Sequence, residues 1–402
     1  MENIRKITSD LYYIGCSDRR ISLFESVYPV PMGVSYNSYL LDDDKTILFD
    51  TVDKACAEQF FENIEAILKD RSLDYMFINH LEPDHSAMIK RVIEKYPSVK
   101  IICSAKAKQM IYQYFEFRND IESNFEVVKE GDKISTKNHE FTFVMAPMVH
   151  WPEVMVTYDI KEGILFAADA FGSFGAINGN IFDNEVEFEP LIDEYRRYYT
   201  NIVGKYGAQV NMLLKKAANL DIKMICPLHG LIIKESILKL IELYSKWASY
   251  TPEVKSVLIP YTSVYGNTQN TAEIIAARLA DKGIKSIKMY DVSVSHDSYV
   301  LSDCFKYSHI IIATTTYNNN VFVNMENFIH DLVNHNLQNR TFAIVENGSW
   351  APNCGTTVKS ELEKLSNCKI LDSKITIKSS VKHSQNTEID TLIDEIVNDL
   401  KK

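Results

Sequence analysis

The sequence feature that most constrains this chain is the motif H-x-E-x-D-H at residues 80–85. Four side chains with imidazole or carboxylate groups follow directly on the apolar run Y-M-F-I at residues 75–78. Such a run predicts a buried strand, and loops that leave buried strands commonly carry binding residues. Imidazole and carboxylate ligands suit zinc, iron or manganese. We therefore expect a metal site at the end of this strand.

Three further residues of the same chemical types each follow a predicted strand: His150 after 141–145, Asp169 after 164–168 and His229 after 222–226. One histidine at a strand end is usually structural, but seven such side chains in one pattern indicate a shared metal site. In an extended loop, alternate residues point the same way. We therefore expect one side of the loop to carry three ligands, with the last histidine turned toward a second metal. The predicted ligands are His80, Glu82, Asp84, His85, His150, Asp169 and His229.

This motif resembles that of the metallo-β-lactamase superfamily, in which the loop usually reads H-x-H-x-D-H and binds zinc. Glu82 replaces the second histidine here. The resemblance implies one metal on His80, Glu82 and His150, a second on Asp84, His85 and His229, and Asp169 between them. The additional carboxylate shifts the preference from zinc toward iron or manganese, and from hydrolysis toward redox chemistry.

The chain is long enough for two domains, and a polar break with a proline at residues 250–253 separates two sequence patterns. Residues 1–250 mix strands and helices, with ligands at strand ends, and predict a sheet sandwich with outer helices. Residues 254–402 alternate strand and helix, with helices expected at about 269–282, 322–335, 355–366 and 388–400. This alternation predicts a doubly wound parallel α/β domain.

Three polar loops follow the first, third and fourth predicted strands of this second domain, where doubly wound sheets bind ligands. The first loop concentrates hydroxyl and backbone N–H groups at a helix start, as the binding of a phosphate monoester requires. Its sequence matches neither the dinucleotide-binding fingerprint nor the P-loop fingerprint. The other two each carry an aromatic side chain able to stack on a flavin ring. The domain resembles flavodoxin, which implies FMN. The expected contacts are Ser263, Val264, Tyr265, Gly266, Asn267 and Thr268; Thr316, Tyr317, Asn318, Asn319 and Asn320; and Ser349, Trp350 and Ala351.

The two domains in this order resemble the flavodiiron proteins (A-type flavoproteins) over essentially the whole chain, in their minimal class. The resemblance implies two iron ions bridged by Asp169, FMN as electron carrier, and reduction of O2 to water, of NO to N2O, or both. It also implies an external, rubredoxin-like electron donor, a head-to-tail homodimer or dimer of dimers, and a tyrosine that hydrogen-bonds the bound diatomic, for which we select Tyr198.

Two alternatives remain at this stage: a zinc-dependent hydrolase with an appended flavodoxin domain, and a redox sensor or electron-transfer protein that uses FMN alone. The net charge of −11 argues against a nucleic-acid partner. Without a signal-peptide pattern or a membrane-spanning run, we expect a cytoplasmic protein without a membrane partner. The seven scattered cysteines predict no disulfide framework, and we assign no role or partner to the six other histidines 139, 296, 309, 330, 335 and 383.

Overall fold

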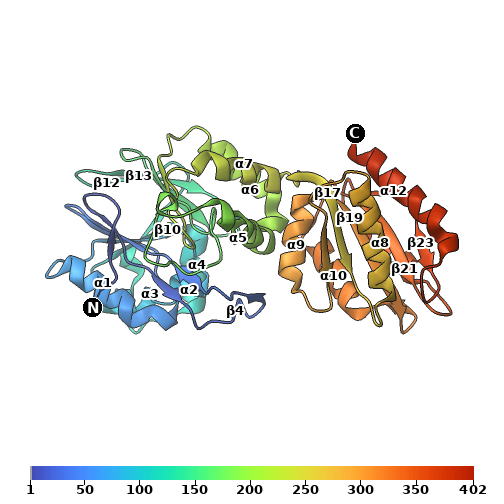
Figure 1. Ribbon diagram of the computed structural model, residues 1–402. Helices are drawn as coiled ribbons and strands as arrows, with labels where there is room; N and C mark the ends of the chain where they lie inside the picture. Colours follow the sequence, from blue (N-terminus) through green and yellow to red (C-terminus); the bar gives the residue numbers. More distant parts are fainter. Residues whose placement is uncertain (1) are drawn as a thin grey trace. The chain divides into compact units, whose positions relative to one another are not determined.

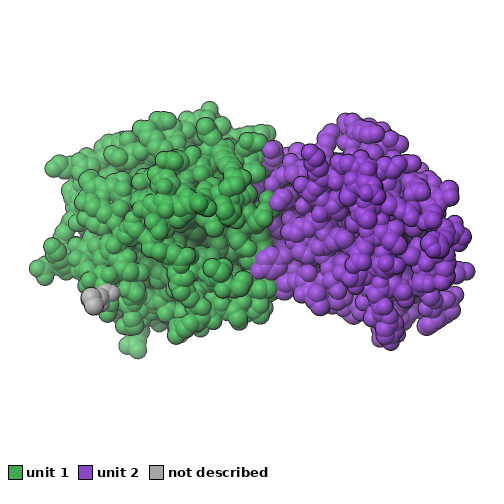
Figure 2. All heavy atoms as spheres, in the orientation of Figure 1, with its two compact units in different colours: residues 1–199, 206–245 green, residues 200–205, 246–402 purple. Residues whose placement is uncertain are grey.

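A computed structural model describes residues 2–402, which divide into two compact units (Figure 2). Unit 1 holds the residues up to Tyr199 together with Tyr206–Ser245, and unit 2 holds Thr200–Lys205 together with Lys246–Lys402. The short segment 200–205 belongs to unit 2 partly because the Tyr250 hydroxyl donates to the carbonyl oxygens of Gly204 and Lys205. Among the described residues, no helix is both long and apolar enough to cross a membrane.

Unit 1 contains two sheets that face each other, which confirms the predicted sandwich (Figure 1). The first sheet has the order β1 (Arg5–Lys6), β2 (Leu11–Tyr13), β7 (Tyr39–Asp42), β8 (Thr46–Phe49), β9 (Tyr75–Ile78), β10 (Lys100–Ser104) and β11 (Phe125–Val128). The second has the order β12 (Lys133–Ser135), β13 (Glu140–Met145), β14 (Met155–Asp159), β15 (Ile164–Phe166) and β16 (Met224–Cys226). Two short ribbons pair β3 (Cys16–Asp18) with β6 (Val34–Tyr36), and β4 (Leu23–Phe24) with β5 (Tyr28–Pro29).

The core of unit 1 lies between these two sheets and is rich in aromatic side chains. Phe49 of β8 stacks on Phe166 of β15 with ring centroids 3.8 Å apart, and Phe77 of β9 meets Phe141 of β13 edge-on at 5.5 Å. Aromatic pairs in these arrangements contribute beyond their buried area. The packing fixes how β9, β13, β15 and β16 end relative to one another, and those ends carry the candidate ligands.

The helices of unit 1 begin and end at recognisable signals. Asp53 caps the 3-10 turn η1 (Lys54–Cys56) that leads into α1, and Ser104 accepts a hydrogen bond from the Ala107 N–H at the start of α4. Phe60 and Ile64 lie on the buried face of α1, as their spacing predicts. The α-helices are α1 (Ala57–Leu68), α2 (Pro83–Ser86), α3 (Ile89–Lys95), α4 (Ala105–Tyr114), α5 (Ile192–Tyr198), α6 (Gly207–Ala217) and α7 (Ile237–Ala248).

Unit 2 is a doubly wound parallel sheet, as predicted. Its main path runs β18 (Lys288–Asp291), β17 (Val254–Tyr261), β19 (Tyr307–Tyr317), β21 (Thr341–Asn347) and β22 (Lys369–Ile370), with β20 (Asn320–Val321) paired to β19 and β23 (Ile375–Ile377) paired to β21. This is the order 2-1-3-4-5, whose switch point lies between β17 and β19. Thr315, near the end of β19, and Asn347, the last residue of β21, are register partners, so the loops after these strands are neighbours.

The helices of unit 2 lie on both faces of its sheet (Figure 1) and are α8 (Asn267–Asp281), α9 (Asp297–Lys306), α10 (Val323–Asn334), α11 (Cys354–Leu362) and α12 (Asn386–Leu400). Helix α9 was not among the predicted helices. His296 caps its start by accepting from the Ser298 N–H, and Val300, Leu301, Cys304 and Phe305 are buried. The two apolar pairs recur four residues apart, which is the helical spacing, but the pattern covers only two turns and was overlooked.

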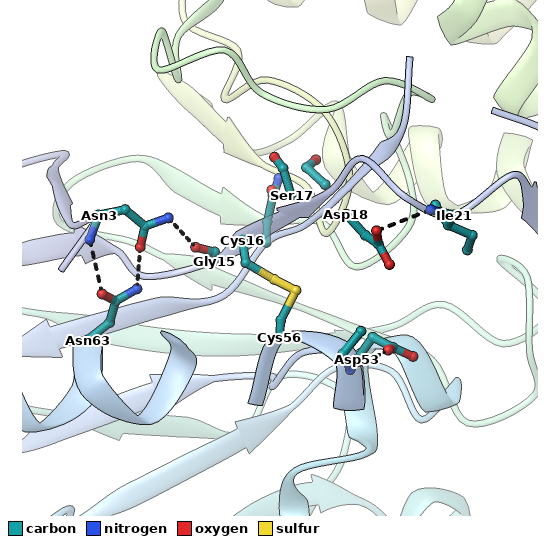
Figure 3. Close-up of a disulfide and its surroundings, with 12 residues drawn as sticks. Asn3, Gly15, Cys16, Ser17, Asp18, Ile21, Asp53, Cys56 and Asn63 are labelled. Carbon is teal, nitrogen blue, oxygen red and sulfur yellow. Dashed lines mark hydrogen bonds between the residues drawn. A yellow bond between two sulfur atoms is a disulfide. The ribbon is translucent and has the colours of Figure 1, made fainter. Parts of the chain in front are cut away.

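The expectation of no disulfide is wrong, because Cys16 and Cys56 form one (Figure 3). Cys16 lies on β3 and Cys56 ends the turn η1, so their meeting depends on the fold rather than on their spacing of 40 residues. Nearby, Asn3 and Asn63 hydrogen-bond each other through side chain and backbone. The remaining cysteines are free, and Cys103 and Cys226 are buried.

Three of the histidines that we expected to lack partners lie beside carboxylates. His139 lies between two carboxylates, with Nδ1 2.5 Å from Asp159 Oδ2 and Nε2 3.2 Å from Asp10 Oδ2. His309 and His335 lie within 3.3 Å of aspartate oxygens. Their partners are distant in sequence or on the next helical turn, so the single-residue context did not reveal them.

Candidate functional site

The candidate metal ligands of unit 1 all follow strand ends, as predicted. Strand β9 ends at Ile78 before the motif at 80–85, and β13 ends at Met145 before His150. Strand β15 ends at Phe166 before Asp169, and β16 ends at Cys226 before His229. Ala168 takes the left-handed conformation (φ 51°), a costly one for a residue with a side chain, and this turn brings Asp169 inward from the strand.

The motif at 80–85 is not the extended loop that we expected. Its second half is helical, since α2 begins at Pro83, and Glu82 occupies the N-cap position. The helical turn therefore separates Asp84 from His80 and Glu82, which corrects the expectation that all three share one side. The seven side chains form two groups in which the candidate ligand atoms lie within 4.8 Å of one another. The first group is His80, Glu82, His150 and Asp169, and the second group is Asp84, His85 and His229.

The first group converges on the Oδ2 side of Asp169. His150 Nε2 lies 3.0 Å from Glu82 Oε2 and 3.1 Å from Asp169 Oδ2. His80 Nε2 lies 3.4 Å from both of these carboxylate oxygens. Two imidazole nitrogens and two carboxylate oxygens therefore face a common point.

The second group converges on the other oxygen of the same aspartate. His85 Nε2 lies 3.2 Å from Asp84 Oδ2, 2.9 Å from His229 Nε2 and 3.4 Å from Asp169 Oδ1. His229 Nε2 lies 3.3 Å from Asp84 Oδ2. Asp169 thus directs one carboxylate oxygen to each group, the placement that a bridging carboxylate requires.

Hydrogen bonds behind the candidate ligands fix the orientation of two of the rings. His80 Nδ1 lies 2.8 Å from Glu153 Oε1, and His229 Nδ1 donates to the Ser35 carbonyl oxygen at 2.7 Å. In both rings Nε2 is therefore left for the site, as is usual for metal-binding histidines. Asp50 accepts from the N–H groups of Asn79 and His80 and so holds the start of the motif. Sequence reasoning missed Glu153, Ser35 and Asp50, because nothing in their local context shows which ring they contact.

The electrostatics of the site show mutual stabilisation of opposite charges. Burial lowers the pKa of His80, but the Asp169 carboxylate more than offsets it and raises that pKa well above its ordinary value. The pKa of His150 is raised to about 9 by Asp169 and Glu82 against the opposing effect of burial. Burial raises the pKa of Asp169, yet His80 and His150 hold it well below its ordinary value. The carboxylates of the site are therefore ionised and attract positive charge.

The donor set fits two divalent cations. Three buried carboxylates bring three negative charges into the interior, which is costly unless cations pair with them. Several atoms that face the two groups have no hydrogen-bond partner among the described residues, namely His80 Nε2, both Oδ atoms of Asp84, and Asp169 Oδ1. The close approach of His85 Nε2 to His229 Nε2 places two lone pairs together unless a proton or a cation lies between them. Mixed oxygen and nitrogen donors suit iron.

Aromatic side chains line the second group. The Tyr36 ring lies 6.3 Å from His85 and 6.0 Å from His229 between centroids, and the Phe24 ring lies 5.3 Å from His229. Tyr198, the residue that we selected from sequence, is fully buried with its ring 5.3 Å from His229. Its hydroxyl has no partner among the described residues, and burial raises its pKa well above the ordinary value. Tyr198 therefore presents a protonated O–H in an apolar setting beside the second group.

The polar loops of unit 2 enclose a cavity of about 420 Å³ at the carboxyl ends of its strands. Residues of all three predicted loops line it, although Gly266 and Asn320 do not. Thr315, Asn347, Gly348 and Ser379 also line it and were not predicted. Ser379 follows β23, whose pairing with β21 carries it to the cavity and is invisible in the sequence.

One end of this cavity suits a phosphate group. Gly266 has a φ of 86° at the N-cap position of α8, so the first N–H groups of the helix face the loop. Ser263 Oγ is buried without a hydrogen-bond partner among the described residues. Thr268 is buried and accepts from Asn347 Nδ2 at 3.2 Å, which joins the first loop to the third. Free donors at a helix start are what an anionic phosphate binds.

Exposed aromatic side chains on the lining of the same cavity suit a flat aromatic ring. Trp350 and Tyr265 are 91% and 92% exposed, so their rings are available to stack on a ligand. Asn318 and Asn319 both have positive φ in the tight turn between β19 and β20, and asparagine tolerates this conformation. Asn353 Nδ2 donates to the Asn319 carbonyl oxygen and holds this turn. The cavity therefore combines free donors at a helix start with exposed aromatic rings, which fits FMN.

The comparisons with known proteins agree with this description of the two units. The family model described as "ODP family beta lactamase" matches residues 34–230, and the flavodoxin model matches residues 259–368. The chain is 31% identical over 333 residues to the nitric oxide reductase of Moorella thermoacetica, covering 81% of each chain. It is 33% identical over 318 residues to the anaerobic nitric oxide reductase flavorubredoxin of Vibrio vulnificus, where it covers 78% of this chain and 63% of the longer relative.

The same architecture is found in solved structures. The rubredoxin oxygen:oxidoreductase of Desulfovibrio gigas superposes with a TM-score of 0.92 at 25% identity, covering 99% of this chain and 98% of that one. Fold and sites thus define a fusion of a metallo-β-lactamase-like domain, which holds paired candidate metal groups, with a flavodoxin domain. The chain belongs to the flavodiiron family.

Proposed function

We propose that this protein is an oxidoreductase that uses a diiron centre and FMN to reduce O2 to water, NO to N2O, or both. One observation carries the proposal: Asp169 directs one oxygen to each of two buried ligand groups in a chain that also holds a flavin-shaped cavity. Two irons would supply redox electrons and open coordination positions for a diatomic, and FMN would restore those electrons. A hydrolase has no use for the second cofactor.

In this proposal the residues of the first and second groups hold the two irons, with Asp169 as the bridge. Glu153 and Ser35 keep the His80 and His229 rings turned so that Nε2 faces the metal. Because these side chains are buried, water is largely excluded and their electrostatic interactions are strengthened. The chain thus supplies a rigid, buried binding site, and two ferrous ions would neutralise the negative charge of its carboxylates.

Tyr198 is the proposed hydrogen-bond donor to the bound diatomic. Its buried hydroxyl lacks a partner among the described residues and lies beside the second group, so a substrate oxygen there would satisfy it. Tyr198→Phe removes only this hydroxyl. We expect it to slow turnover while iron and flavin contents remain those of the unsubstituted protein.

We propose domain boundaries at 1–250 for the diiron domain and 254–402 for the FMN domain.

We also propose a head-to-tail homodimer, or a dimer of such dimers, in which each flavin serves the metals of the partner. The two cofactor sites belong to different units, so electrons must pass between units in any arrangement. An external, rubredoxin-like donor would reduce the flavin, and the cytoplasmic location stays a prediction.

The direct test is parallel anaerobic turnover with O2 and with NO on protein whose iron, zinc and FMN contents have been measured. We expect about two irons and one flavin per chain, and consumption of at least one of the two gases with a suitable donor. The hydrolase alternative would be supported if the purified protein contains zinc and no flavin, and if it stays inactive with both gases after it is loaded with iron and FMN. Flavin without iron and without turnover would support the electron-transfer alternative.

The dimer is tested separately by mixing inactive subunits. A Glu82→Ala subunit lacks a metal ligand, and a subunit with substitutions in the flavin loops lacks FMN. If each flavin serves the partner, mixed dimers contain one complete pair of sites and recover part of the activity. Homodimers of either variant stay inactive, and failure of the mixture to recover any activity would contradict the arrangement.

A further inference from the structure

The Cys16–Cys56 disulfide lies on the wall of a second cavity in unit 1, remote in sequence from the motif at 80–85. This cavity has a volume of about 430 Å³, and both cysteines belong to its lining. Each cysteine keeps a small exposed fraction, 6% for Cys16 and 9% for Cys56. The disulfide is therefore mostly covered by protein, yet a small molecule inside the cavity would contact it.

The cavity is positively charged. Its lining includes Arg5 and Arg19 and contains no aspartate or glutamate. Arg5 is paired with Glu185 at 2.8 Å, outside the lining. Arg19 instead donates to neutral acceptors, the Ile177 carbonyl oxygen at 2.7 Å and Asn178 Oδ1 at 2.8 Å. These two bonds hold the guanidinium in place without cancelling its charge, so the cavity attracts anions.

A covered disulfide that shares a cavity with an arginine lacking a carboxylate partner among the described residues has a specific chemical use. Disulfides are opened by thiolates, and the rate depends on the concentration of thiolate and on access to the sulfur. A fixed positive charge raises the local concentration of an anionic thiol and stabilises the thiolate that leaves. A carboxylate on the incoming thiol would bind a guanidinium as carboxylates commonly do.

We propose that Cys16–Cys56 is a thiol–disulfide exchange site for small thiols that carry a carboxylate, with Arg19 as the recognition residue. The incoming thiolate forms a bond to one Sγ, the Cys16–Cys56 bond breaks, and the other Sγ leaves as a thiolate. A second small thiol then attacks the mixed disulfide and departs joined to the first. Two electrons and two protons pass to the protein, two small thiols become one disulfide, and the reverse reaction restores the bridge.

The site is independent of the proposed metal and flavin chemistry. Its lining includes none of the candidate ligands or flavin contacts, so the exchange can be measured on the full chain whatever its metal content. The full chain is purified without reductant, and the oxidised fraction is measured by mass spectrometry after alkylation. Reduction is then followed with 3-mercaptopropionate, 2-mercaptoethanol and 2-mercaptoethylamine, which are anionic, neutral and cationic.

With rates expressed per thiolate, we expect the anionic thiol to react about tenfold faster than the cationic one, and added salt to diminish this preference. Arg19→Ala should remove most of the preference. Arg20→Ala is the matched control, because it removes the same charge from the neighbouring exposed arginine, which does not line the cavity. This variant should keep the preference for the anionic thiol. Should Arg19→Ala not fold, Arg19→Gln and the salt dependence of the unsubstituted chain provide the same comparison.

Four outcomes would overturn the proposal. The first is a purified protein in which Cys16 and Cys56 are both free and do not form the bridge with an added small disulfide. The second is reduction no faster than global unfolding of the chain. The third is equal reactivity of the three thiols at low salt, and the fourth is equal loss of the preference in Arg19→Ala and Arg20→Ala.

Discussion

The metal centre of unit 1 and the flavin cavity of unit 2 are both built at the carboxyl ends of strands, but by different means. The metal centre consists of side chains that are nearly all buried and are held by a further layer of hydrogen bonds. The flavin cavity consists of loops, and its lining includes a helix start and two almost fully exposed aromatic rings. The first site recognises charge, and the second recognises shape and a phosphate.

This difference follows from what each site must overcome. A buried carboxylate without a cation is very costly, so the ligand groups of unit 1 depend on one another and on the ions that they hold. A loop that ends a strand satisfies its own backbone at the surface and does not depend on the ligand in this way. Substitutions in unit 1 should therefore have large and coupled effects, and those in the flavin loops should have small and separable ones.

The largest effect is expected for Asp169→Asn. Its oxygens face both groups, so we expect the affinity for both metals to fall by more than about 100-fold, beyond what loss of a supporting residue typically costs. Asp84→Asn should weaken mainly the metal of the second group. Metal analysis after dialysis measures both effects, with the exposed Asp221→Asn as control. Retention of one full metal equivalent by Asp169→Asn would contradict the bridging role.

The next effect is expected for Glu153→Gln, which keeps the shape of the side chain behind His80 but removes its charge. We expect a loss of about 10- to 100-fold in the affinity of the first metal, because ligand orientation and basicity both depend on this contact. The second metal should be retained. Chelator competition resolves the two metals. Equal weakening of both would show that the groups are more strongly coupled than their hydrogen bonds suggest.

A smaller effect is expected for His139, which lies between Asp159 and Asp10 in unit 1. Burial alone lowers the pKa of His139, but the two carboxylates more than offset this and raise it to about 9. Because the pKa is raised in the folded state, the stabilisation is complete below the ordinary pKa near 6.5. It is lost as the pH rises through about 9. Urea unfolding at pH 6 and pH 9.5 should show His139→Gln to be less stable by on the order of 2 kcal/mol at pH 6. A deficit that is unchanged at pH 9.5 would assign the effect to packing.

The smallest effect is expected for Trp350→Ala in the flavin cavity. Loss of one stacking ring should weaken FMN binding by about 1 kcal/mol, or roughly fivefold, while metal content stays unchanged. Fluorescence titration of the flavin-free protein measures this change, and Trp350→Phe should restore most of the affinity. A loss of 100-fold or more would mean that the flavin site is as tightly interdependent as the metal centre.

Much of the fold followed from local patterns. The predicted strands at 75–78 and 141–145 correspond to β9 and β13. Helix α9 was missed although its apolar pairs recur at the helical spacing of four residues, because the pattern covers only two turns. The seven candidate ligands could be selected because their chemical types recur directly after predicted strands. This signal can be read from the sequence without knowing how far apart the residues lie in the folded protein. Glu153, Ser35 and Ser379 carry no such signal, since each acts through a neighbour that only strand pairing supplies.

The sequence by itself determined which chemical groups are available and at which strand ends, because periodicity and residue type are local properties. Tertiary structure decided the local geometry that residue spacing alone had misjudged: the turn of α2 sends Asp84 and His85 to one group and leaves His80 and Glu82 in the other, the division that the family resemblance implied. It also paired Cys16 with Cys56 and brought Arg19 to the lining of the same cavity. These outcomes depend on contacts between residues far apart in the chain, and only the packing of the sheets and loops sets those distances.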